Sequence, residues 1–303
     1  MKDGEEHVGI STVVRIGDTV RRPPGPWTPA VQGLLAHFER AGFAGAPRAL
    51  GFDAEGREVL QYVEGHAPQG PEVAALPEGS VFQVGRLMRR MHRAARGFSP
   101  EPARWAHEPF ASGPGSVVCH NDIAPRNTVF VDGRPVAFID WEAAGRGTPQ
   151  WDLAQAAWQF APLTDDGGCA ALGWRTPPDR GRRFRLLVEG YGLAPAERAG
   201  LAGLAAARIR FTLDLIRRRA AAGEAGFVQL VESGLADGVE RDALWTEAHR
   251  DELTAALYDG TPLDGALPEG DRPDGDRPDG DRLGGDRLGG VPLGGSPLAP
   301  EPA

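Results

Sequence analysis

Two aspartates and an asparagine near the middle of the chain form a set that suits phosphate chemistry. Asp122 stands five residues before Asn127, and Asp140 ends the apolar run that follows. Carboxylate and amide oxygens suit Mg²⁺, which takes one or two carboxylates from a protein and its other ligands from water and phosphate. Asp122 has no obvious partner in the sequence, so we expect its carboxylate to be free to accept a proton from a hydroxyl. The set predicts phosphoryl transfer from a magnesium-bound nucleotide.

A β-hairpin is predicted to bring these residues together. Thr128 to Val131 has the pattern of one strand, Pro135 to Ile139 that of the returning strand, and an Asp-Gly pair suggests the turn. Two registers are open: one pairs Asn127 with Asp140, and the other pairs it with Phe138. In both registers the amide and the carboxylate lie at the same open end of the hairpin.

The stretch from Ser116 to Ala154 resembles a known catalytic loop. With His120 two residues before Asp122, it is similar to the aminoglycoside phosphotransferase and choline kinase family, the small-molecule branch of the protein-kinase-like fold. The resemblance implies that Asp122 is the catalytic base and that His120 shapes the loop. It also implies that Asn127 and Asp140 bind Mg²⁺, with ATP or GTP as the phosphoryl donor.

The expected fold class is α+β, a two-lobed protein-kinase-like fold. Strand and helix patterns over residues 1–64 predict a small sheet-plus-helix N-lobe, which resembles the family's nucleotide-binding lobe, shortened at its start. Residues 65–260 are expected to form a larger, mostly helical C-lobe for catalysis and acceptor binding. Its last helices are predicted over residues 180–191, 195–222, 227–235 and 239–258. Within the C-lobe the resemblance implies that Asp152 is a structural support.

Residues 261–303 differ in composition from the rest of the chain. They contain five-residue repeats rich in glycine and proline and no aromatic residue, which predicts a disordered tail. Nine acidic residues and four arginines give this segment a charge of −5 out of the total of −9. The remainder is only mildly acidic, which argues against nucleic acid as the main partner.

Other features of the composition point to the cytoplasm. The chain has no run of roughly 18 apolar residues, so we expect no membrane span. Its first residues are acidic and lack the apolar core of a signal peptide. The two cysteines, Cys119 and Cys169, are too few for a disulfide framework and are expected to be free thiols in a reducing compartment.

The residues expected to bind the phosphoryl donor, here called the donor side, depart from the family pattern. The family has a phosphate-binding lysine, whereas the only lysine here is the second residue of the chain. Arg22 is the favoured replacement for the family's phosphate-binding lysine, with Arg21 and Arg15 as competitors. Val20 would face the same side of that strand and form an apolar wall for adenine. An arginine can bind phosphate through two nitrogens, but its reach differs from that of lysine.

Other donor-side features are also incomplete. The helix that should supply a glutamate to pair with the lysine has no acid near its start: Gln32 is the nearest polar residue, and Glu39 comes a turn or more too late. We therefore expect the pair to be absent or rebuilt. Gly9 is the lone candidate for a phosphate-covering loop. Tyr62 and Val63 resemble the family's hinge, where backbone groups would bind adenine.

Three functions are compatible with these residues. The first is a phosphotransferase that moves the γ-phosphate of Mg·ATP or Mg·GTP to a hydroxyl of a small molecule, with antibiotic resistance as one role. The alternative is a catalytically weak or inactive kinase-like protein that acts by binding or immunity, and the third is an interaction protein that acts through its tail. The acceptor stays open between aminoglycoside-, homoserine-, choline- and macrolide-like hydroxyls. The carboxylates available for a polycationic acceptor are Asp165, Asp166, Asp214 and Glu224, whereas Arg182, Arg183 and Arg185 would suit a less cationic one.

Overall fold

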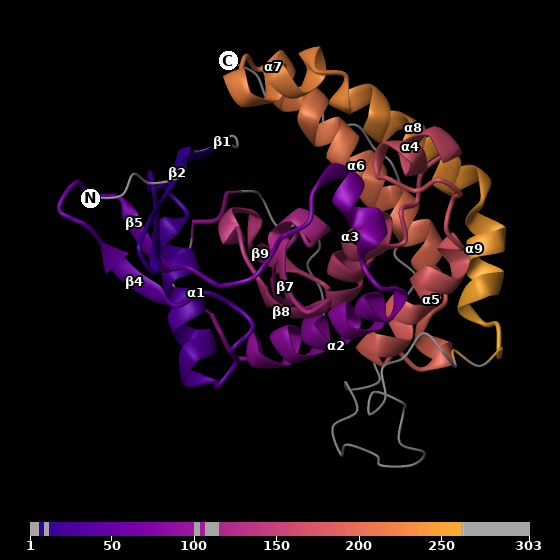
Figure 1. The fold of residues 1–303 in the computed structure, drawn as a ribbon, viewed down its shortest axis with the longest axis horizontal. Helices are drawn as coiled ribbons and strands as arrows, with labels where there is room; N and C mark the ends of the chain where they lie inside the picture. Colours follow the sequence, from indigo (N-terminus) through magenta and orange to yellow (C-terminus); the bar gives the residue numbers. More distant parts are fainter. Residues whose placement is uncertain (1–5, 9–11, 100–103, 107–114, 262, 264–303) are drawn as a thin grey trace, which may run out of the picture. The chain divides into compact units, whose positions relative to one another are not determined.

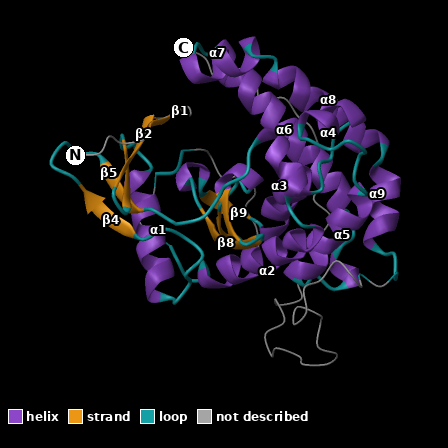
Figure 2. Ribbon diagram, in the orientation of Figure 1, coloured by secondary structure: helices purple, strands orange, loops and turns teal. Residues whose placement is uncertain are grey.

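A five-stranded antiparallel sheet and one helix make up the first lobe (Figures 1 and 2). The structure is a computed structural model, and it describes residues 6–8, 12–99, 104–106, 115–261 and 263. Gly9 and, apart from residues 261 and 263, the predicted tail therefore lie outside the described residues. The strands, in the spatial order β1-β2-β3-β5-β4, are β1 (Glu6–Val8), β2 (Thr12–Ile16), β3 (Thr19–Arg22), β4 (Ala49–Phe52) and β5 (Glu58–Gln61).

Helix α1 (Thr28–Arg40) provides the core of this lobe. Proline in its first turn is preorganised for a helix, and Gly42, just past its end, has a φ of +72° that suits glycine. The predicted apolar stripe is buried: Val31, Leu34, Leu35 and Phe38. Phe38 contacts Trp141 edge to face, with ring centroids 5.2 Å apart. The core of α1 therefore reaches the segment that follows Asp140.

The second lobe is mostly helical and carries two short two-stranded sheets, β6–β9 and β7–β8 (Figure 2). Its elements are α2 (Glu78–Ala94), β6 (Val117–Cys119), β7 (Thr128–Val131), β8 (Arg134–Phe138), β9 (Gly145–Gly147), α3 (Pro149–Phe160), α4 (Asp166–Ala171), α5 (Arg180–Tyr191), α6 (Leu201–Ala221), α7 (Ala225–Glu232), α8 (Leu235–Ala248) and α9 (Arg250–Leu257). The α+β class and the division into a sheet-bearing and a helical lobe are confirmed. Among the described residues, no helix is both long and apolar enough to cross a membrane.

Two of the predicted helices are interrupted. The segment predicted as one helix over 195–222 is a short 3₁₀ turn followed by α6, which begins after Gly200 at a φ of +76°. The segment predicted over 239–258 is divided between α8 and α9 at His249, whose ring stacks on Trp245. Apolar periodicity continues across both breaks, so it did not reveal them.

The β7–β8 hairpin has a register between the two that the sequence allowed. Asp132 and Gly133 both have positive φ, as a two-residue turn of this type requires, and the turn pairs Val131 with Arg134. The register then shifts by one residue between Val129 and Phe130. As a result, the N–H of Ile139 donates to the carbonyl of Asn127 at 2.9 Å. Both predicted pairings are wrong by one position, but Asp140 directly follows the residue opposite Asn127.

Helices α2 and α5 approach so closely that their contact requires glycine (Figure 1). A Cβ added to Gly85 on α2 would overlap the carbonyl oxygen of Leu187 and lie 2.6 Å from the backbone nitrogen of Tyr191. These neighbours are helical backbone, which cannot move aside as a flexible side chain can. The close approach places α2, which carries His92, against the rest of the helical lobe.

We predict that Gly85→Ala lowers the free energy of unfolding by about 2 kcal/mol, the usual cost of an overpacked core. The matched control is Gly33→Ala on α1, where a Cβ would lie 3.6 Å from the Phe98 ring, an ordinary contact. Because alanine favours a helix, this control should be neutral or stabilising by about 0.5–1 kcal/mol. Urea unfolding of both variants measures the difference. Equal effects would contradict the close approach of the two helices.

Candidate active site

A buried carboxylate holds the loop that carries Asp122. Asp152, on α3, is fully buried, and its Oδ1 accepts the N–H of Asn121 at 2.8 Å. Its Oδ2 accepts the N–H of His120 at 2.9 Å and lies 3.1 Å from Nε2 of His92. Asn121 has a φ of +65°, in the left-handed region, which asparagine tolerates better than most residues other than glycine. Asp152 therefore holds the loop in an uncommon backbone conformation, the kind of supporting role that the family resemblance implies.

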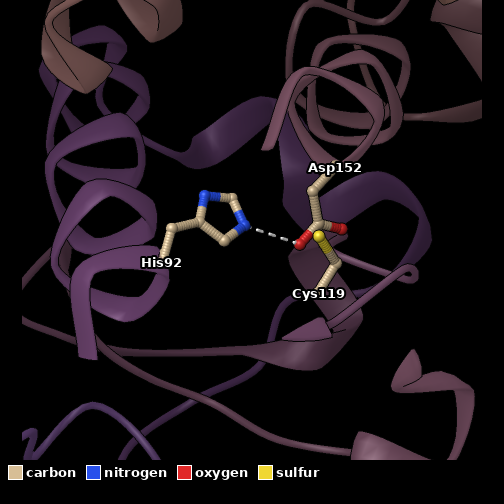
Figure 3. A group of neighbouring side chains, drawn as sticks. All are labelled: His92, Cys119 and Asp152. Atoms are coloured by element: carbon tan, nitrogen blue, oxygen red, sulfur yellow. Dashed lines mark hydrogen bonds and ion pairs between the residues drawn. The ribbon is translucent and has the colours of Figure 1, made fainter. Parts of the chain in front are cut away.

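Three nearby side chains could at first be taken for a metal site. His92, Cys119 and Asp152 offer ligand atoms within 4.8 Å of one another, and Figure 3 shows the imidazole directed at the carboxylate beside the sulfur. Asp152, however, already accepts three N–H groups. Burial and the charge of Asp152 raise the pKa of the Cys119 thiol well above its usual value, so the metal-binding thiolate is disfavoured. We interpret this group as a structural support.

His120 connects the loop to the end of the hairpin. It is fully buried, and its Nε2 lies 2.9 Å from the carbonyl oxygen of Ile139, which can only accept. The opposite ring nitrogen, Nδ1, then accepts the N–H of Asp122 at 3.3 Å. A neutral imidazole meets both requirements. His120 thus sets the distance between the backbone of Asp122 and the residue before Asp140.

Asp122 is not free, contrary to the expectation from the sequence. Arg126 places Nη2 at 2.9 and 2.8 Å from its two carboxylate oxygens. Asn127 donates from Nδ2 to Oδ2 at 2.8 Å, and Gln155 donates from Nε2 to Oδ1 at 3.3 Å. The four-residue spacing of Arg126 was a signal that could have been noticed. The contact with Gln155 joins two segments that are distant in sequence, so it could not have been predicted from spacing.

Asn127 and Asp140 lie at one end of the hairpin with oxygens suited to a cation. The two hydrogen bonds of the Asn127 side chain both use Nδ2, so neither occupies its oxygen. Asp140 starts a 3₁₀ turn with a φ of +61°, and its side chain is 53% exposed. Two residues later, Glu142 adds a second carboxylate, and burial raises its pKa although Arg22 opposes the shift. Sequence reasoning overlooked Glu142.

Arg22 connects the sheet to these carboxylates. It is 5% exposed, and its Nη1 lies 3.2 Å from both Asp140 and Glu142. Its Nε donates to Glu58 at 2.5 Å, and the amide of Gln32 donates to the other oxygen of Glu58 at 2.8 Å. Burial lowers the pKa of Arg22, but the surrounding carboxylates outweigh this effect and raise it.

The expected ion pair is therefore rebuilt rather than absent. Its acid is Glu58, which lies directly opposite Arg22 in the β3–β5 register and comes from a strand instead of a helix. Gln32, the nearest polar residue on α1, contacts this pair through its hydrogen bond to Glu58. An isolated acid at the start of an apolar strand was the one sequence signal for Glu58, and it was missed.

The remaining donor-side residues lie on the sheet. Val20 pairs with Leu60, and the N–H of Tyr62 donates to the carbonyl of Asp18 at 2.8 Å. Val63 follows and is partly buried. The competitors of Arg22 are engaged elsewhere: Arg21 lies 3.4 Å from Asp53, and Arg15 lies 3.5 Å above the centre of the Tyr62 ring and pairs with Glu64.

Comparisons with known proteins identify the family of this chain. Residues 100–186 match the sequence model of the phosphotransferase enzyme family. The chain is also 39% identical over 198 residues to the trifolitoxin immunity protein of Rhizobium leguminosarum bv. trifolii, covering 63% of this chain and 74% of that protein. The chain belongs to the phosphotransferase enzyme family. The match includes the loop of Asp122 and both short sheets around it.

Solved structures support membership at the level of the fold. A choline/ethanolamine kinase family protein from Mesorhizobium loti superposes with a TM-score of 0.56 and 20% identity, covering 84% of this chain and 92% of the other. The GDP complex of aminoglycoside 2′-phosphotransferase-IIIa gives a TM-score of 0.55 and 13% identity over 80% and 93% of the two chains. These relatives have the two-lobed protein-kinase-like fold that the sequence predicted.

We predict that Asp152→Asn lowers the free energy of unfolding at pH 7 by about 3 kcal/mol, because an amide would direct a donor at buried N–H groups. Burial alone would raise the pKa of Asp152, but its bonds with His92 and the loop amides lower it overall. The charged form therefore stabilises the fold above about pH 4, the pKa of an unfolded aspartate, and this stabilisation is lost as the pH falls further.

The difference in free energy of unfolding between the wild type and Asp152→Asn should accordingly become smaller below about pH 4, as measured by urea unfolding. Asp166→Asn is the control, because Asp166 pairs with Arg180 through a side chain that is 80% exposed. Such surface pairs contribute about 0–1 kcal/mol. If the two variants lose the same stability, Asp152 does not support the loop.

Proposed function

We propose that the protein transfers the γ-phosphate of Mg·ATP or Mg·GTP to the hydroxyl of a small molecule. The observation that carries this proposal is the convergence of Asp122, Asn127 and Asp140 at one end of the β7–β8 hairpin, with Arg22 bonded to Asp140. Membership of the phosphotransferase enzyme family supports the reaction class.

The residues present fit a magnesium ion. Asn127 offers an amide oxygen and Asp140 a half-exposed carboxylate, and these are hard oxygen donors of the kind that Mg²⁺ prefers. One or two carboxylates leave room for water and phosphate in an octahedral shell. When bound, the ion would neutralise charge on the phosphates. We therefore assign Asn127 and Asp140 as its protein ligands.

Arg22 is the proposed phosphate contact on the donor side. Its three anionic partners engage Nε and Nη1, whereas Nη2 is buried without a hydrogen-bond partner among the described residues. A buried N–H of this kind is costly unless a ligand satisfies it. Glu58 holds the guanidinium in place, much as a helix glutamate would hold a lysine. Val20 on the same strand, with Tyr62 and Val63 after β5, would bind the nucleotide base.

Asp122 is the proposed base. In the reaction, the acceptor oxygen forms a bond to the γ-phosphorus, and the bond from that phosphorus to the bridging oxygen of the diphosphate breaks. The acceptor's proton passes to the carboxylate of Asp122, and the nucleoside diphosphate leaves. Asn127 and Gln155 orient the carboxylate through the hydrogen bonds described above.

A second function is favoured by one specific observation, the 39% identity to an immunity protein. On this alternative, the chain protects its host from a toxin by binding, without phosphorylation. The engagement of Asp122 by three side chains is compatible with such a role. Retention of all three phosphotransfer residues is harder to explain if they have no chemical task.

We predict that Asp122→Asn reduces label transfer from γ-³²P-labelled nucleotide by about 10²–10⁴-fold, the usual contribution of a positioned base. Nucleotide affinity should change little, because Asp122 is not a proposed donor-site ligand. Asp132→Asn, in the hairpin turn, is the matched control, since asparagine tolerates its positive φ of +50°. Rate assays with hydroxyl compounds and with water measure the effect.

Each outcome of that assay separates the two functions. Transfer by Asp122→Asn at the wild-type rate would contradict the role of Asp122. Absence of transfer by the wild type, combined with toxin protection that survives in Asp122→Asn, would favour immunity by binding.

A further inference from the structure

Four side chains next to Asp122 form a group that the donor chemistry does not use. We call it the acceptor-side cluster; its members are Arg126, Trp151, Gln155 and Phe211. Trp151 and Gln155 lie four residues apart on α3, and the Trp151 ring meets Phe211 of α6 edge to face, with centroids 5.6 Å apart. Gln155 contacts the carboxylate of Asp122, so the cluster borders the proposed base.

Two buried polar atoms of this cluster point to a ligand. Gln155 is 2% exposed and Trp151 is 8% exposed. Oε1 of Gln155 and Nε1 of Trp151 are both buried without a hydrogen-bond partner among the described residues. An unsatisfied buried polar group is unfavourable, so proteins seldom retain one without a use. Here a hydrogen-bond acceptor and a donor lie on one helix beside the base.

Arg126 is the partner of Asp122 that an incoming hydroxyl can displace. The two carboxylate oxygens have about four acceptor positions, and the donors already present use them. Asn127 and Gln155 are buried, whereas the side chain of Arg126 is 48% exposed. Exposed ion pairs contribute little to stability, so exchanging Arg126 for a hydroxyl at this position costs little free energy.

Once displaced, the guanidinium of Arg126 is available to bind another anion within reach. A carboxylate or phosphate group matches its planar array of donors. A second guanidinium, which is buried, increases the positive potential behind the loop: Arg208 on α6 donates to the carbonyl of Asn121 at 2.8 Å. Burial lowers the pKa of Arg208 to about 10, partly offset by the charge of Asp122, and the group remains charged at neutral pH.

Three of the four carboxylates available for a polycationic acceptor, all but Asp214, have partners elsewhere. Asp165 accepts the N–H of Gly168 and caps α4. Asp166 pairs with Arg180 at 2.8 Å, and Glu224 pairs with Arg219. None of these contacts involves the acceptor-side cluster. Among the contacts described for the cluster, its one carboxylate is Asp122 itself, which favours an acceptor that is not cationic.

We propose that the acceptor is a small hydroxyl compound bearing an anionic group, a carboxylate or a phosphate, which Arg126 binds when the hydroxyl takes its place on Asp122. Gln155 and Trp151 supply a hydrogen-bond acceptor and a donor to the other polar groups of that compound. This inference rests on the proposed phosphotransferase function and adds the substrate class.

The test uses four compounds with one three-carbon skeleton: D-glycerate, sn-glycerol 3-phosphate, glycerol and 3-amino-1,2-propanediol. Label transfer from γ-³²P-labelled nucleotide with Mg²⁺ is measured for the full chain, after a titration that establishes nucleotide binding. We expect the carboxylate or the phosphate compound to exceed glycerol at least about tenfold, in line with a charge-assisted hydrogen bond. A higher rate with D-glycerate would identify a carboxylate as the anionic group, and a higher rate with sn-glycerol 3-phosphate would identify a phosphate.

Variants of Arg126 test whether this residue causes the preference for anionic over neutral acceptors. Arg126→Ala should reduce the ratio of anionic to neutral transfer towards one, and Arg126→Lys should restore part of it. Arg126→Glu should reverse the preference towards 3-amino-1,2-propanediol, a gain that misfolding cannot produce. Arg217→Ala is the matched control, because Arg217 is also 48% exposed and pairs with Glu240 on the surface.

Preferred transfer to glycerol or to the amine by the wild type would overturn the inference. So would an anionic preference that persists in Arg126→Ala, or transfer to none of the four compounds while nucleotide binds. Failure to bind any nucleotide would instead overturn the proposed function itself, so the two failures are distinguishable.

Discussion

The carboxylate of Asp152 is the constraint on which the site depends. It accepts the N–H groups of His120 and Asn121 and the imidazole of His92, all in the protein interior. A charged acceptor is needed there because the N–H groups of the loop would otherwise be buried and unsatisfied. Because Asp152 fixes the backbone of His120 and Asn121, it also positions Asp122, the next residue. His120 in turn contacts the N–H of Asp122 and the carbonyl of Ile139, the residue before Asp140. The close packing of α2 against α5 supports it, since α2 carries His92.

A second constraint joins the sheet to the hairpin through charge. Arg22 contacts Glu58 within the sheet and Asp140 and Glu142 beyond it. Three carboxylates around one guanidinium leave a net negative charge, which a divalent cation could balance. The replacement of lysine by arginine is thus accompanied by a change of partner, because the acid comes from the neighbouring strand. Two arginines are paired with aspartates that are proposed to take part in the reaction: Arg22 with Asp140, and Arg126 with Asp122.

Much of the fold could be predicted from the sequence, because it depends on local patterns. The apolar stripe of α1, the hairpin turn and the extent of α5 all follow from spacing and turn chemistry. The one-residue register shift in the hairpin could not be foreseen, since turn and strand patterns fix a register only where the ladder is regular. The partners of the site residues were harder still: Glu58 and Gln155 reach Arg22 and Asp122 through tertiary contacts that leave no spacing signal. The prediction that Asp122 is free failed in part for this reason, and in part because the local signal of Arg126, four residues away, was not used.

The central claim is that Asn127 and Asp140 form a working site for a magnesium-bound nucleotide. Calorimetric titration with ATP and with GTP, each with and without Mg²⁺, tests it most directly when the wild type is compared with Asp140→Ala. The account predicts that one nucleotide binds, that Mg²⁺ strengthens the binding, and that Asp140→Ala removes this strengthening. No binding of either nucleotide at millimolar concentration, or a magnesium effect that survives in Asp140→Ala, would contradict it.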